Sequence, residues 1–304
     1  MTLKSLLTLL LILQYSTANA QIDTLRSKAS IEAYLKHRYH YKSFQLKEVN
    51  SIIKDSTALP ASDPKYWLKA DFNHDGKIDL FAAASVDEGK RGVHDLFLIL
   101  ASDHKHYSKV DIGHPLDYWM HGGTTSWAIY SKSNLDYLVM YCLTAKIPRL
   151  KTGGWGIRLA YTVTHDTLSV LDAKPIVYAS HPSKLKIESI KFSTTQYFGT
   201  CPVFQLIIKQ DGSVSYKGIE YVEKKGDFNL IMTKSELNYL NKLLTNLNLP
   251  LLEDNYQVDY TDSQTAYLTI RYTNGQTKEI EDYGLQGTFG LATLYSFLFG
   301  LRNF

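Results

Sequence analysis

The residues whose types and spacing most clearly suggest chemistry form an acidic loop with the pattern D-x-N-x-D-G-x-x-D, which runs from Asp71 to Asp79. Ca²⁺ is a hard cation that takes about six to eight oxygen ligands. Alternate positions direct Asp71, Asn73 and Asp75 towards a common centre, and Gly76 permits the sharp turn of the backbone. The predicted calcium ligands are Asp71, Asn73, Asp75, the carbonyl oxygen of Lys77, and Asp79, which closes the site directly or through water. The alternative is an ion-free hairpin turn that uses Asp, Asn and Gly for its geometry.

The sequence on both sides of the loop is typical of strands rather than helices. Trp67–Ala70 precede the loop and Leu80–Ala82 follow it, and Ala82 stands at the twelfth position, where an EF-hand carries a bidentate glutamate. With these flanks the loop resembles the calcium loops of FG-GAP and VCBS-type β-repeats. The resemblance implies a structural ion that neutralises clustered carboxylates, for which binding as weak as about 10⁻⁴ M suffices outside the cytoplasm.

Histidines are concentrated in the segment 94–121. Five of the ten histidines lie there, namely His94, His104, His106, His114 and His121. His104 and His106 would lie on one face of a strand, which is a start for a zinc site. No H-E-x-x-H or C-x-x-C pattern accompanies them, and exposed loop histidines are the simpler interpretation. A zinc-dependent hydrolase that uses this cluster is therefore the alternative functional hypothesis.

The chain has two cysteines, Cys142 and Cys201. In an exported protein they could form one disulfide. Cys142 falls in a segment expected to form a buried strand, where a free cysteine acts as a small hydrophobe. The two cysteines also fall in different predicted domains, and the sequence does not supply the geometry that a bridge requires.

The first 20 residues have the pattern of a signal peptide. Lys4 is followed by an apolar run at residues 6–13, and Ala18-Asn19-Ala20 supplies the small residues of a cleavage site. The apolar run is shorter than the roughly 20 residues of a membrane-spanning helix. We therefore expect an exported protein, periplasmic or extracellular, with no transmembrane segment after cleavage. The net charge of +3 among 304 residues gives no support for nucleic-acid binding.

Two domains are expected after the signal peptide. Residues 21–180 begin with a helical pattern at Ser30 and continue as short runs rich in Tyr, Ile, Val and Phe, which predict a mostly antiparallel β domain. Residues 180–184 are the candidate linker. Residues 185–304 predict an α+β domain with the order ββαββα, in which Thr233 and Glu236 form a capping box and Asn274-Gly275 form a hairpin turn.

The C-terminal domain carries a distinctive string, Phe198-Gly199-Thr200-Cys201-Pro202-Val203-Phe204. Together with the segment 208–218, it resembles the DUF6438 family, a bacterial domain of unknown function that often occurs on exported proteins, notably in Bacteroidota. The resemblance covers about residues 187–303 and implies no activity. Members of that family often have a second cysteine four residues before the one in this string, where this chain has Tyr197.

These patterns favour an exported, non-enzymatic protein that binds a protein or carbohydrate ligand, or takes part in interactions at the cell envelope. Its N-terminal domain would hold one structural Ca²⁺ ion. Three histidines or acids meeting in one concave pocket would instead favour the zinc hydrolase.

Overall fold

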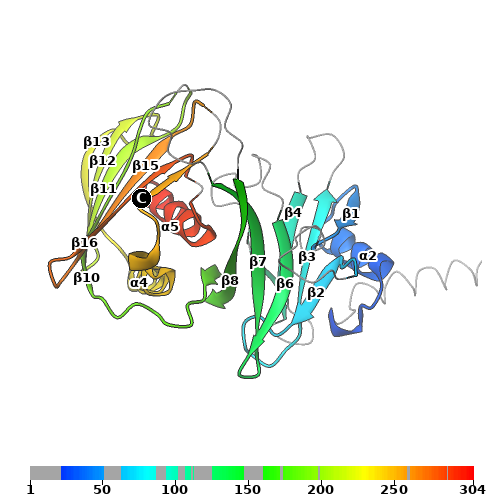
Figure 1. Ribbon diagram of the computed structural model, residues 1–304. Helices are drawn as coiled ribbons and strands as arrows, with labels where there is room; N and C mark the ends of the chain where they lie inside the picture. The colour runs from blue at the N-terminus through cyan, green and yellow to red at the C-terminus, as the bar shows by residue number, and fades with distance from the viewer. Residues whose placement is uncertain are drawn as a thin grey trace, which may run out of the picture. The chain divides into compact units, whose positions relative to one another are not determined.

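The computed structural model describes residues 22–50, 63–86, 94–101, 107–110, 112, 125–146, 160–171, 174–197, 199–258, 261–285 and 287–304. Figure 1 labels most of its helices and strands. Strands predominate and pair almost entirely antiparallel, and helices lie near the beginning and the end of the described sequence. The chain is therefore of the α+β class, as predicted.

The chain divides into two compact units. Among the described residues, the N-terminal unit contains those up to 112, together with 125–141 and 167–175. The C-terminal unit contains 142–146, 160–166 and the described residues from 176 to 304. Within the described part of the chain, no helix has the length and apolar character that crossing a membrane requires.

The N-terminal unit contains a five-stranded antiparallel sheet with the order β1-β3-β4-β5, in which β2 also pairs with β3. Its strands are β1 (Phe44–Lys47), β2 (Trp67–Ala70), β3 (Asp79–Val86), β4 (His94–Ala101) and β5 (Tyr107–Val110). β2 pairs with the first half of β3 and β1 with its second half, while β4 lies along the other side of β3. β3 is therefore the central strand, and its first six residues are all buried.

Helix α2 (Lys28–Arg38) follows a short 3₁₀ turn, η1 (Ile22–Thr24), and packs on this sheet. It begins before the predicted start at Ser30, because Ser27 is the N-cap and Ser30 completes a reciprocal capping box with it. The core that α2 shares with the sheet includes Ile31, Tyr34, Leu35, Leu80, Ala82, Ala84, Phe97 and Ile99. From β3, Phe81 instead contacts Trp127, with ring centroids 4.7 Å apart. Both faces of β3 are therefore covered by apolar side chains.

A second, four-stranded sheet has the sequential order β6-β7-β8-β9. Its strands are β6 (Thr125–Lys132), β7 (Leu135–Lys146), β8 (Ala160–Leu171) and β9 (Lys174–Val177). The sequence did not predict β9 or β1. Each of these two strands has a single buried position, so neither shows a clear alternation of apolar and polar residues.

The C-terminal unit is built on a seven-stranded sheet with the order β13-β12-β11-β10-β15-β16-β14. Its strands are β10 (Ile187–Thr194), β11 (Val203–Lys209), β12 (Ser213–Glu220), β13 (Gly226–Ile231), β14 (Asn255–Gln257), β15 (Thr265–Tyr272) and β16 (Thr277–Tyr283). Its helices are α4 (Lys234–Leu247), η2 (Leu249–Leu251) and α5 (Phe289–Gly300), and Figure 1 shows α4 and α5 on the same side of the sheet. The predicted ββαββα order places the two helices correctly, but it has only four strands, whereas the structure has four strands before α4 and three between α4 and α5.

An aromatic cluster joins α5 to the middle of this sheet. The Phe192 ring on β10 lies 5.5 Å from Tyr295 and 5.9 Å from Phe299, both on α5. Phe204 on β11 lies 5.0 Å from Phe299. On β10 and β11, buried residues alternate with residues that are exposed or half-buried. α5 therefore covers the apolar face of the sheet.

Candidate functional site

The acidic loop is the connection between β2 and β3. Ala70 and Asp79 are paired in the antiparallel register, so residues 71–78 close the hairpin. The Asp71 carboxylate accepts hydrogen bonds from the amides of Asp75 (3.0 Å) and Gly76 (2.7 Å). Gly76 has a φ of +86°, a left-handed conformation that favours glycine. Asp71, the first predicted ligand, therefore also stabilises the turn through these two hydrogen bonds.

The side chains of Asn73 and Asp75 accept hydrogen bonds from backbone amides of the same loop. The Asn73 side-chain oxygen accepts from the Asp75 amide at 3.2 Å, and Asp75 Oδ1 accepts from the Lys77 amide at 3.0 Å. Lys77 Nζ lies 3.7 Å from Asp75 Oδ2. Asp71 and Asn73 are half-buried and Asp75 is exposed. A carboxylate oxygen that accepts one hydrogen bond keeps a lone pair, so these side chains can still accept a cation from solvent.

Asp79 has a different setting from the other predicted ligands. It is fully buried, with 0% of its surface exposed. Its Oδ2 accepts from the Phe72 amide and its Oδ1 from the Ala101 amide, both at 2.9 Å. Burial raises the pKa of Asp79 to about 6. Its side chain therefore ties the start of the loop to the end of β4.

The described residues contain no group of three or more His, Cys, Asp and Glu side chains arranged to hold a metal ion. A calcium ion at the loop would therefore draw on the Asn73 amide and backbone carbonyl oxygens as well as on Asp71 and Asp75. Such mixed oxygen ligands are ordinary for Ca²⁺.

His74, at the tip of the loop, makes a contact that the sequence did not predict. Its Nε2 donates to the carbonyl oxygen of Asp136 at 2.9 Å, and its ring lies 4.9 Å from that of Tyr137. The backbone of His74 has a φ of +62°, which lies in the left-handed region that non-glycine residues seldom adopt. The loop is therefore anchored to β7 at its tip and to β4 through Asp79.

The histidine cluster falls almost entirely outside the described residues. His104, His106, His114 and His121 lie there, and His94 is the first residue of β4, opposite Ser85. The zinc hypothesis therefore stays a prediction.

Cys201 has a free, half-buried thiol, so it takes part in no disulfide in this structure. The neighbouring Cys201 thiol raises the pKa of Tyr197.

Two carboxylates at the start of α5, one buried and one half-buried, were not predicted as site residues from the sequence. Asp282 is fully buried and accepts from the Gly287 amide at 2.8 Å, and Asp166 accepts from the Phe289 amide at 3.2 Å. Burial raises the pKa of Asp166. Negative charge is favourable at a helix N-terminus, so the two side chains fix the position at which α5 begins.

Comparison with known families bears on the C-terminal unit. This unit is an α+β domain with α4 and α5 on one side of a seven-stranded sheet that is antiparallel except for the pair β14 and β16. Residues 188–302 match the family described as Domain of unknown function (DUF6438), which confirms the resemblance drawn from the segment around Cys201. No curated protein matches the chain.

Proposed function

We propose that this chain is an exported, non-enzymatic binding protein whose N-terminal unit holds one structural Ca²⁺ ion in the loop Asp71–Asp79. The calcium proposal rests on the eight-residue hairpin connection between β2 and β3, which contains Asp71, Asn73 and Asp75. In it, the Asp71 and Asn73 side chains both accept a hydrogen bond from the Asp75 amide. We propose these three side chains and the Lys77 carbonyl oxygen as ligands. Both carboxylate oxygens of Asp79 accept hydrogen bonds from backbone amides. Asp79 would therefore hold the loop in position and close the calcium site directly or through water.

Calcium is expected to raise the melting temperature of the protein purified as residues 21–304. An ion that binds only the folded state stabilises it by about 2.7 kcal/mol at a hundredfold excess over the dissociation constant. Thermal unfolding is followed with excess chelator and again with Ca²⁺ at ~10 mM, a hundredfold excess for a site of ~10⁻⁴ M.

The variant Asp75→Ala tests whether that shift arises at the loop. Asp75→Ala should abolish the calcium-dependent shift, because it removes an exposed ligand. Asp63→Ala, which removes an exposed carboxylate elsewhere in the same unit, should keep the shift. Equal melting temperatures in chelator and in calcium would refute the calcium proposal.

Export is proposed from residues 1–20, which lie outside the described residues. When the full-length chain is expressed in a bacterial host, the intact mass of the product is expected to match a chain that begins at Gln21. The product should be recovered from the periplasm or the medium. A product that retains Met1 and stays in the cytoplasmic fraction would contradict this assignment.

A further inference from the structure

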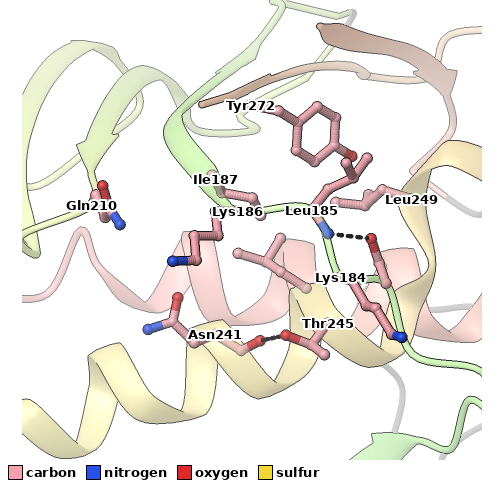
Figure 2. Close-up of a pocket in the computed structure, with 11 residues that line it drawn as sticks. Lys184, Leu185, Lys186, Ile187, Gln210, Asn241, Thr245, Leu249 and Tyr272 are labelled. Carbon is pink, nitrogen blue, oxygen red and sulfur yellow. Dashed lines mark hydrogen bonds between the residues drawn. The ribbon is translucent and has the colours of Figure 1, made fainter. Parts of the chain in front are cut away.

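The C-terminal unit contains a pocket of about 430 Å³. It lies between the segment 183–187 that leads into β10, helix α4 and the end of β15, as Figure 2 shows. The segment is held in place by its backbone, since the Ser183 amide donates to the Thr245 carbonyl at 3.0 Å and the Thr273 amide donates to the Lys186 carbonyl at 2.9 Å. This volume is within the range of about 300–1,000 Å³ that is typical of small-molecule sites.

The charge of the pocket is positive. Its eleven lining residues include Lys184 and Lys186 and no aspartate or glutamate. In Figure 2 the Lys186 amine extends to the side of the pocket where the amides of Gln210 and Asn241 lie. A lysine and two amides offer several hydrogen-bond donors to one bound group, and the lysine favours a negative one.

The other end of the pocket contains a buried hydroxyl. Tyr272 on β15 is 3% exposed, and its hydroxyl has no hydrogen-bond partner among the described residues. Figure 2 shows that this hydroxyl points towards Leu185 and Leu249. Burial raises the pKa of Tyr272, so the hydroxyl stays protonated and can donate. A buried polar group without a partner is unfavourable, and a ligand that accepts from it would remove that penalty.

We propose that this pocket binds a small organic anion. Lys186, with the amides of Gln210 and Asn241, would hold a carboxylate or phosphate group, and the Tyr272 hydroxyl would donate to a polar atom on the rest of the molecule. Leu244 adds apolar surface to the lining of the pocket. This inference rests on the proposed binding role but not on calcium, which concerns the other unit.

The test is a titration of the ¹⁵N-labelled chain, residues 21–304, with three probes: glucuronate, glucose 6-phosphate and glucose. Either anion should shift the amide resonances of the pocket at millimolar concentration, and glucose should bind at least tenfold more weakly. Comparing glucuronate with glucose 6-phosphate distinguishes the carboxylate from the phosphate. The proposal is overturned if neither anion shifts these resonances at up to ~50 mM, or if glucose binds as well as the anions do.

Two variants with matched controls locate the binding. Lys186→Gln and Tyr272→Phe should each weaken the better anion about tenfold, which corresponds to about 1.4 kcal/mol. The controls are Lys191→Gln and Tyr267→Phe, which alter exposed residues of β10 and β15 that do not line the pocket and should leave affinity unchanged. Equal losses in variants and controls would overturn the assignment.

Stability provides a second readout. Tyr272→Phe should not lower the melting temperature of the ligand-free protein, because the hydroxyl that it removes has no partner there. A clear fall would show that the hydroxyl is already satisfied, which contradicts the argument for the pocket. The calcium experiment uses the variant Asp75→Ala and concerns only the N-terminal unit. Failure of the calcium proposal can therefore be distinguished from failure of the anion proposal.

Discussion

Asp79→Ala is expected to lower the free energy of unfolding of the N-terminal unit by about 2–4 kcal/mol. The substitution leaves the amides of Phe72 and Ala101 buried without acceptors, and hydrogen bonds to charged groups are stronger than neutral ones. Part of this loss is offset, because the ionised Asp79 is itself destabilised by burial, which is why its pKa is raised to about 6. The expected loss is therefore smaller than two full charged hydrogen bonds would give.

The measurement is urea unfolding at pH 7 in the presence of chelator, so that calcium contributes nothing. Asp79→Asn should lose less than Asp79→Ala, since the amide keeps one acceptor of nearly the same shape. Asp63→Ala should lose little, because Asp63 is exposed. If Asp79→Ala destabilises the unit only when calcium is present, Asp79 acts as a metal ligand rather than as the anchor between the loop and β4.

The different roles of the loop residues show where sequence reasoning reaches its limit. The alternation of oxygen-bearing side chains predicted a tight turn, and in the hairpin the Asp71 and Asn73 side chains both accept a hydrogen bond from the Asp75 amide. The same pattern treats Asp79 as one more ligand. Its inward direction is set by the register of β3, where it pairs with Ala70, and by Ala101 on β4. Pairing between strands that are distant in sequence leaves no local signal.

The same reason explains which parts of the C-terminal unit could be predicted. Helix α4 could be predicted because its capping box, Thr233 with Glu236, and its stripe of apolar residues are local patterns. The hairpin turn at Asn274-Gly275 is a local pattern as well. The strand β13 is mostly exposed at the edge of the sheet, so its apolar pattern is weak. The pocket depends on Lys186, Gln210, Asn241 and Tyr272, which belong to four separate segments and meet only through the fold.

Phe192→Ala is expected to lower the free energy of unfolding of the C-terminal unit by about 3–5 kcal/mol, the usual range for deletion of a buried phenylalanine. Phe192 is 1% exposed, and its ring lies 5.7 Å from Phe204 as well as against Tyr295 and Phe299 of α5. Removing it would leave a cavity where α5 meets β10 and β11, and rings that are held by a helix and two strands can close only part of that space.

Hydrogen exchange of peptides from each unit measures this effect, because amides exchange according to the free energy of the opening that exposes them. In Phe192→Ala, the amides of β10, β11 and α5 should exchange faster, while those of β3 and β4 should keep the rates of the parent chain. Lys191→Ala, which truncates the exposed neighbour of Phe192 on the same strand, is the control and should change neither set. Equal acceleration in both units would mean that they unfold together. Acceleration confined to the C-terminal unit would mean that the part of the chain matched by the family at 188–302 depends on its own aromatic core.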